Sequence, residues 1–424
     1  MTTLSRRRFL AASGVGLGTL GAVTALGTSL SLAAPGVPND GDTLVVLFLA
    51  GGADGLSTTP PYTMGSYYDE RPTIAVGAPG TNGGALRLDR SNSRARFSSG
   101  FDGLVGLHPS LKALHDGLWA DGKLAVIPAA GLPGSSYSHF QAFKRVERGS
   151  VSNTVGGGWL ARMLNAQGGP GPIAGAFNGR GAASLVGSRA SVGLIGSLDS
   201  FALGGFRDKD AAAAALASFN VGNDAVSFEG RKILSTVDQV EPLDGALRPG
   251  YDNNAYGRSF SELSTLLKAD PTLGIRAATI KIGGWDMHRS LGRAGDTGGN
   301  FWTKMSQVGN AIAAFASDTN GLDGVTVVVM SEFGRTINEN GNAGTDHGQG
   351  TTYLVAGNGI RGGVYGDDFV DSLALEGRRR GAVPYLTDYR KVLGELVRKR
   401  AKLAQDGPVF PGFSQNGSDL GLSA

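Results

Sequence analysis

Apolar runs and amphipathic segments alternate along most of this chain. Five runs consist largely of apolar residues, at positions 43–50, 123–129, 275–282, 325–330 and 352–356. Runs of this kind predict strands that are buried on both faces, as in a parallel sheet covered by helices.

Segments with helical spacing of their apolar positions lie between and after these runs. The predicted helices cover residues 109–118, 138–148, 159–164, 211–218, 259–268, 301–316 and 385–403. Strands that alternate with helices predict an α/β fold. We expect a doubly wound, mostly parallel sheet with helices on both faces, arranged as a three-layer sandwich.

The chain shows no internal repeat and no clear domain boundary after its first 42 residues. We therefore expect one domain over residues 43–424, preceded by a leader at 1–34 and a linker at 35–42. Residues 166–225 are rich in glycine and alanine, and we interpret them as a peripheral region of that domain.

The N-terminus has the pattern of an export signal. Arg6, Arg7 and Arg8 precede Phe9 and Leu10, and a weakly apolar stretch then leads to small residues near position 34. A basic start, an apolar middle and small residues before a cleavage point are typical of secretory signals. The paired arginines resemble the twin-arginine type.

The leader therefore predicts export to the periplasm, the cell envelope or the medium, with the twin-arginine translocase as a transient partner. A retained membrane anchor is the alternative. The leader lacks a strongly apolar run of the roughly 20 residues that a span requires, which favours cleavage. No later segment is apolar enough to span a membrane.

Composition excludes several classes of function. The formal net charge is only +3 and no basic patch lies outside the two ends, which argues against nucleic acid as a partner. The chain has no cysteine, so disulfides, thiolate chemistry and a formylglycine made from cysteine are excluded. A bound metal would need Asp, Glu, His or hydroxyl ligands.

Polar residues follow the predicted strands, where ligands bind in sheets of this class. Asp54 follows the first strand, Asp286 and His288 follow the strand at 275–282, and Glu332 follows the strand at 325–330. We expect these side chains to share one site. Taken singly, Asp54 could instead close an Asx turn, and Glu332 could pair with Arg335.

Ser138 and His139 open a predicted helix after the strand at 123–129. Ser138 is either an N-cap or a nucleophile that attacks a phosphorus or sulfur centre, and Ser135 and Ser136 are its competitors. His139 could be a metal ligand, a donor to an anion, or structural.

One further motif places Asp346 and His347 between Gly344 and Gly348. Glycines on both sides suggest close approach of the backbone or unusual backbone angles. This favours His347 as a metal ligand and Asp346 as a residue that orients a ligand. We interpret His108 as structural and His115 as a surface residue.

Together these motifs resemble the domain-of-unknown-function family 1501. The resemblance covers nearly the whole mature chain and rests on the leader, Gly51-Gly52-Ala53-Asp54-Gly55, Leu107-His108-Pro109, Ser138-His139-Phe140, Gly284-Trp285-Asp286-x-His288, Ser331-Glu332-Phe333-Gly334-Arg335-Thr336 and Gly344–Gly348. That family is grouped with the alkaline phosphatase and sulfatase superfamily. The resemblance implies an alkaline phosphatase-like fold and a site for one or two divalent metals, often zinc.

The resemblance also implies roles for individual residues. Asp286, His288 and His347 match the ligands of one metal, for which we expect zinc. Asp54, the nucleophile Ser138 and Glu332 match those of a second metal, but Phe333 stands where the superfamily pattern has a histidine. A second ion would then prefer oxygen ligands, as Mg²⁺, Mn²⁺ and Ca²⁺ do.

These expectations predict an exported, metal-dependent hydrolase of phosphate or sulfate esters. Ser138, His139 and Arg335 would act on a small or glycan-linked anionic ester, with Arg335 neutralising its charge. The alternative is a non-catalytic envelope protein of the same fold, with a structural or vestigial metal site.

Overall fold

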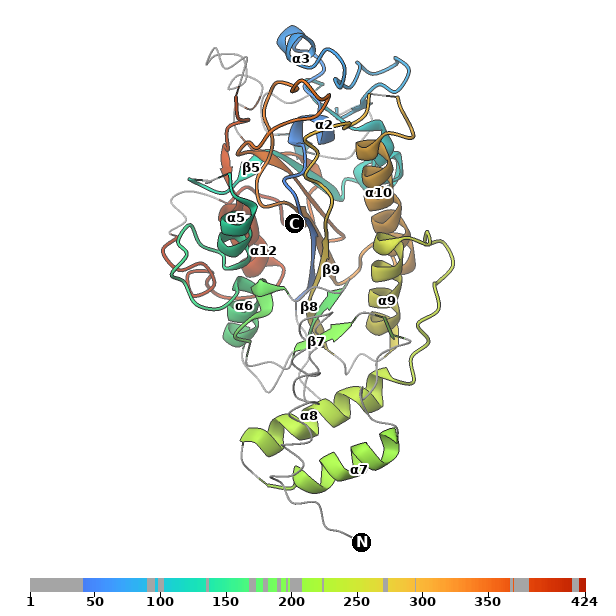
Figure 1. Ribbon diagram of the computed structural model, residues 1–424, viewed down its shortest axis with the longest axis vertical. Coiled ribbons are helices and arrows are strands. Elements are labelled where there is room, and N and C mark those ends of the chain that lie inside the picture. The colour runs from blue at the N-terminus through green and yellow to red at the C-terminus, as the bar shows by residue number, and fades with distance from the viewer. Residues whose placement is uncertain are drawn as a thin grey trace.

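A ten-stranded sheet forms the centre of the computed structural model (Figure 1). The structure describes residues 41–89, 96–97, 103–134, 137–167, 173–177, 182–188, 192–195, 197–198, 208–222, 225–269, 274–293, 295–366, 369, 381–413 and 419–424. The predicted leader at 1–34 and most of the linker at 35–42 lie outside these residues. Within the described part of the chain, no helix combines the length and the apolar character that crossing a bilayer requires.

The sheet is parallel except at one strand. Its order is β3-β11-β5-β10-β9-β1-β8-β6-β7, and β12 also pairs with β5. These strands are β1 (Thr43–Leu49), β3 (Arg96–Phe97), β5 (Leu124–Gly131), β6 (Ile173–Phe177), β7 (Val192–Ile195), β8 (Ile275–Ile282), β9 (Val325–Met330), β10 (Thr351–Gly357), β11 (Gly363–Val364) and β12 (Thr387–Asp388). Strand β10 runs antiparallel to both of its neighbours, β9 and β5.

Helices cover both faces of the sheet, so the predicted three-layer α/β architecture is confirmed. The helices α5 (His139–Glu147), α6 (Trp159–Gln167) and α12 (Tyr389–Lys399) lie on one face, and α9 (Ala255–Ala269) and α10 (Asn300–Asp318) lie on the other (Figure 1). Alternate residues of β1 enter the two cores, with Leu47 packed on the α9–α10 side and Val46 on the α5–α12 side. This burial on both faces is why the run at 43–50 shows no polar alternation.

Short elements and one helix pair complete the chain. They are α2 (Gly55–Thr58), α3 (Gly65–Glu70), β2 (Leu86–Arg87), β4 (Gly106–Leu107), the helical turns Pro109–Leu111, Lys112–Leu114, His115–Trp119 and Ala183–Leu185, α7 (Lys209–Phe219) and α8 (Ala225–Val240). The pair α7–α8 lies at one end of the molecule, opposite α2 and α3 (Figure 1).

Three features differ from the sequence expectation. The region at 166–225 contributes the last two strands at one end of the sheet, β6 and the edge strand β7, whose short glycine-containing sequences gave no strand pattern. Helix α8 was also not predicted. The C-terminal helix begins at Tyr389 rather than near 385, because Asp388 caps it by accepting from the backbone N–H of Arg390.

Candidate metal centre

Four strand-end segments meet at one edge of the sheet. Parallel strands β5, β9, β1 and β8 bring the residues that follow them to that edge. His347 precedes β10, and it reaches the same edge because β10 is the one antiparallel strand among them. Its position therefore depends on a strand direction that the sequence did not predict.

Asp286 lies at the point where these segments converge. Its Oδ1 is 3.0 Å from Nε2 of His288, 3.2 Å from Nε2 of His347 and 3.4 Å from Nε2 of His139. The two Nε2 atoms of His288 and His347 are 3.0 Å apart. His139, Asp286 and His347 form a group that could hold a metal ion.

The outer nitrogen of each ring is bound to a hydrogen-bond acceptor. Nδ1 of His347 lies 2.7 Å from the carbonyl oxygen of Tyr137, and Nδ1 of His288 lies 2.9 Å from Oδ1 of Asp346. Nδ1 of His139 lies 2.5 Å from Oε1 of Glu332. Carbonyl and carboxylate oxygens accept, so these partners assign the proton to Nδ1 and leave a lone pair on each Nε2.

The three Nε2 lone pairs and the carboxylate of Asp286 therefore lie together, and none of the three neutral rings supplies a hydrogen between them. Nε2 of His139 is buried and has no hydrogen-bond partner. Ligand atoms around a tetrahedral zinc ion, each about 2.0–2.1 Å from it, lie roughly 3.3 Å apart, close to the spacings seen here. Histidine ligands also typically donate their other nitrogen to a carboxylate or carbonyl. The residues present thus fit a zinc-like ion.

Solvent reaches one side of this centre. The side chains of Asp286 and His288 are 46% and 41% exposed, whereas those of His139 and His347 are about half as exposed. A centre that is open on one side leaves room for a further ligand, as catalytic zinc sites do.

Arg335 fixes the position of the Asp286 carboxylate. Its Nη2 donates to Oδ1 of Asp286 over 2.7 Å, and its Nη1 lies 3.5 Å from Nε2 of His288. Its other donors bind the carbonyl oxygens of Gly51, Gly52, Trp285 and Thr345. The side chain is buried and fully engaged, which suits it to position Asp286 rather than to bind the charge of a substrate.

The same contacts shift the pKa values in the centre. Burial raises the pKa of Asp286, but hydrogen bonding and charge from Arg335, with His347 and His139, outweigh it and bring the pKa to about 2. The hydrogen bond to Glu332 raises the pKa of His139. Burial lowers the pKa of His347. Asp286 is therefore ionised at any ordinary pH, and His139 binds a proton before His347 does.

Glu332 lies behind His139 instead of facing the other ligands. It is completely buried, accepts from the backbone N–H of Gly51, and contacts the hydroxyl of Ser331 as well as the ring of His139. The alternative Arg335–Glu332 pair does not form, because the carboxylate that Arg335 binds is Asp286. In this arrangement Glu332 fixes the orientation of His139.

Asp54 forms an ion pair with a buried arginine, Arg71. Both of its oxygens accept from the buried guanidinium of Arg71, at 2.9 and 3.0 Å, and Oδ1 also caps α2 through the N–H of Ser57. Burial raises the pKa of Asp54, but Arg71 outweighs it and holds the pKa below its usual range. Asp54 therefore closes the local turn, which is the alternative to metal binding that its sequence context offered. Among the described residues, no group of three possible metal ligands includes Asp54 or Glu332.

Ser138 is the N-cap residue of α5, directly before His139. Its side chain makes no capping hydrogen bond, so the hydroxyl is not used for that purpose. Its competitors Ser135 and Ser136 lie outside the described residues. The preceding residue, Tyr137, has a positive φ of 54°, a strained conformation for an aromatic residue, and its carbonyl binds His347.

Two glycines allow the loop that carries His347 to pack closely. A Cβ on Gly344 would lie 2.3 Å from the backbone of His288, and a Cβ on Gly348 would lie 2.0 Å from the carbonyl oxygen of Arg335. No side chain fits at either position. The glycines thus bring the 345–347 segment against the segments that carry His288 and Arg335, as the sequence pattern suggested.

Phe333 packs against the rings of two histidines of the centre. Its buried ring lies 4.7 Å from the ring of His139 and 4.9 Å from that of His347, measured between centroids. It supplies an apolar wall for these two rings and no ligand atom.

The other two histidines lie apart from this group. His108 is buried and caps the turn at Pro109–Leu111, and burial lowers its pKa to about 3, so it stays neutral. His115 binds Asp116 and the carbonyl oxygen of Arg87. Sequence reasoning missed the partners Arg71 and Asn340, the latter donating to Asp346, since neither carries a local motif.

Comparisons with known proteins identify a family but no activity. The family described as "Protein of unknown function (DUF1501)" matches residues 42–376. No curated protein matches the chain. The C-terminal periplasmic domain of EcEptC from Escherichia coli, solved in complex with Zn, aligns over 91% of each chain with 13% identity and a TM-score of 0.35. A likeness this distant carries no argument about chemistry.

The contacts of the rings predict the order in which they titrate in the metal-free protein. His139 should titrate above 6.5, the ordinary value for histidine, and His347 below it, and both should carry Nδ1–H when neutral. Long-range ¹H–¹⁵N NMR can resolve the chain's five histidines. Glu332→Gln should lower the pKa of His139. Nε2–H tautomers, or a His347 that titrates above His139, would contradict this geometry.

Zinc affinity should fall when any part of the centre is removed. We expect Asp346→Ala to weaken zinc binding by about 10–100-fold, as losing the partner of a ligand usually does, and His347→Ala to weaken it further. Isothermal titration with zinc measures both, with His115→Ala as the matched control. In each protein the affinity should fall as the pH drops through the pKa of His139. Equal affinity in His347→Ala and His115→Ala would refute the assignment.

Removing the charge of Asp54 should reduce stability without releasing metal. Asp54→Asn leaves Arg71 buried without its counter-ion, which costs about 3–5 kcal/mol of unfolding free energy. Urea unfolding measures the loss, and elemental analysis of the folded protein counts the ions. If the variant loses one equivalent of metal at unchanged stability, Asp54 is a ligand after all.

Proposed function

The chain belongs to the DUF1501 family, whose description names no function. From the geometry of the candidate metal centre, we propose that it is a metal-dependent hydrolase of phosphate or sulfate esters. One observation carries the proposal. Three imidazole Nε2 atoms, held in one tautomer by their Nδ1 partners, converge on Oδ1 of Asp286 at an edge of the sheet that is open to solvent.

His139, Asp286 and His347 would hold the ion, with His288 as a further candidate ligand. Imidazole nitrogen with one carboxylate favours zinc over Mg²⁺ or Ca²⁺, which prefer oxygen. A bound divalent ion would polarise an ester oxygen and increase the acidity of a nearby hydroxyl. The contacts of Asp54 and Glu332 favour one ion over two.

Ser138 is our candidate nucleophile. It directly precedes His139, and its side chain makes no capping bond that would occupy the hydroxyl. In the proposed reaction Oγ forms a bond to phosphorus or sulfur while the ester bond to the alcohol breaks, and water then releases the phosphate or sulfate and restores the serine.

The chain's charged groups have separate tasks in this scheme. Asp286 stays ionised because of Arg335, so it is available as a ligand throughout the ordinary pH range. Glu332 keeps the lone pair of His139 directed at the centre. The substrate's charge would be met at the ion, because Arg335 has its donors bound within the protein.

The cellular location proposed here rests on the leader. The Arg6-Arg7-Arg8-Phe9-Leu10 sequence supports export by the twin-arginine route, which carries folded proteins. The substrate would accordingly be an ester of the periplasm, the envelope or the medium.

A non-catalytic envelope protein is the second candidate. The observation that favours it is the composition of the site, where Phe333 supplies no ligand and Arg71 neutralises Asp54. A single ion held only by protein groups would serve structure or binding.

Substitution of the serine separates these two functions. In zinc-loaded protein assayed on aryl phosphates, phosphodiesters and sulfates, Ser138→Ala should lower kcat by about a thousandfold or more while metal content stays unchanged. Ser218→Ala, on α7, is the control and should keep full activity. If Ser138→Ala turns over like the unsubstituted protein, the nucleophile is wrong. Bound metal without turnover on any ester would favour the non-catalytic function.

A further inference from the structure

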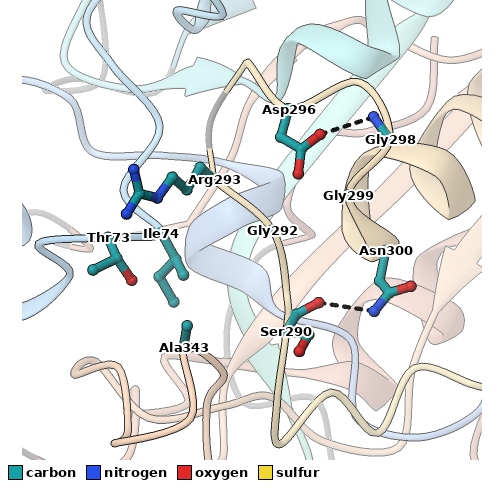
Figure 2. A pocket seen from close by; sticks show the side chains of 10 residues that line it. All are labelled: Thr73, Ile74, Ser290, Gly292, Arg293, Asp296, Gly298, Gly299, Asn300 and Ala343. Carbon is teal, nitrogen blue, oxygen red and sulfur yellow. Dashed lines mark hydrogen bonds between the residues drawn. The ribbon is translucent and has the colours of Figure 1, made fainter.

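A pocket of about 470 Å³ is lined in part by Ser290 and Ala343, which belong to the loops that also carry His288 and His347 (Figure 2). Its walls come from Thr73 and Ile74, from residues of the 290–293 and 296–300 segments, and from Ala343. This volume falls within the range of about 300–1,000 Å³ that is usual for small-molecule sites. Nothing in the proposed metal chemistry uses it.

The pocket shares its walls with the two loops that carry metal-ligand candidates. Ser290 follows His288 by two residues, so their Cα atoms lie within about 7 Å of one another. Backbone hydrogen bonds from Ser290 to Asn342 and from Leu291 to Ala343 join the two loops at the pocket. A ligand in the pocket would therefore contact the same two loops that carry His288 and His347.

The lining offers hydrogen-bond donors and acceptors in a mixed set. The guanidinium of Arg293 makes no ion pair with any residue that the structure describes, and in Figure 2 it extends towards Thr73 and Ile74. Asp296 uses Oδ1 to accept from Gly298. Asn300 donates from Nδ2 to the carbonyl oxygen of Ser290, which leaves its amide oxygen as an acceptor.

The balance of these groups selects the chemistry of the ligand. A second anion would be attracted by Arg293 but repelled by the carboxylate of Asp296. A cation would be attracted by Asp296 but repelled by Arg293. An apolar group would contact Ile74 and Ala343 but would also cover the charged side chains of Arg293 and Asp296, which is costly. A neutral group with many hydroxyls both donates and accepts, so it can satisfy the whole lining.

We propose that this pocket binds the sugar or polyol portion of the substrate. The inference rests on the proposed ester hydrolysis and narrows its substrate to phosphate or sulfate esters of polyhydroxylated compounds. The ester lies at the metal centre and the neighbouring hydroxyls lie between Arg293 and Asp296.

Paired substrates test the pocket in the zinc-loaded protein. Glucose 6-phosphate and glucose 6-sulfate carry hydroxyls, whereas 4-nitrophenyl phosphate and sulfate carry none outside the ester. Arg293→Ala and Asp296→Asn should each raise KM for the glucose esters about tenfold, the effect of one lost hydrogen bond to a charged group, and change KM and kcat for the aryl esters less than twofold. Arg258→Ala, another exposed arginine, should change neither.

The possible outcomes test the pocket assignment and the proposed ester hydrolysis separately. If esters are hydrolysed but Arg293→Ala leaves KM for the glucose esters unchanged, the pocket assignment is wrong and the proposed function stands. If no ester is hydrolysed, the proposed function fails, and saturation-transfer NMR with glucose tests the pocket alone. A glucose signal that Arg293→Ala abolishes supports the pocket; no signal, or an equal signal in the variant, overturns it.

Discussion

The ion pair between Arg335 and Asp286 is the interaction on which the candidate centre depends. The guanidinium donates to Asp286 and also to carbonyl oxygens that follow β1 and β8 and precede β10. It thereby fixes three chain segments that come from distant parts of the sequence. Because Arg335 is buried, these bonds form where water does not compete, and an unpaired carbonyl would be costly. That arrangement holds Asp286 at the point on which the Nε2 atoms converge.

The outer partners of the rings complete the centre. A carbonyl of strained backbone at Tyr137, the buried Glu332 and the solvent-exposed Asp346 each accept from one Nδ1. The hydrogen bond to Glu332 raises the pKa of His139, whereas burial of its ring lowers the pKa of His347 despite the hydrogen bond to Tyr137. The centre therefore combines fixed geometry with one ring, His139, that binds protons more readily than His347 does.

Sequence alone predicted the architecture and the neighbourhood of the site, because both depend on local patterns. Apolar runs marked the long strands, and the rule that strand ends share an edge grouped Asp286, His288 and Glu332. The partners could not be predicted in the same way. That Asp54 binds Arg71, and that Glu332 lies behind His139, depends on tertiary contacts between 17 and 193 positions apart. The composition of β10 also does not indicate that it runs antiparallel to its neighbours, the direction that places His347 at the centre.

The central claim is that one divalent ion lies among His139, Asp286, His288 and His347. Anomalous diffraction at the zinc edge, from crystals of protein purified with zinc, tests it most directly. The account predicts a single strong peak at bonding distance, about 2.0–2.1 Å, from Oδ1 of Asp286 and the surrounding Nε2 atoms. No peak at this position, or a peak between Asp54 and Glu332, would contradict it.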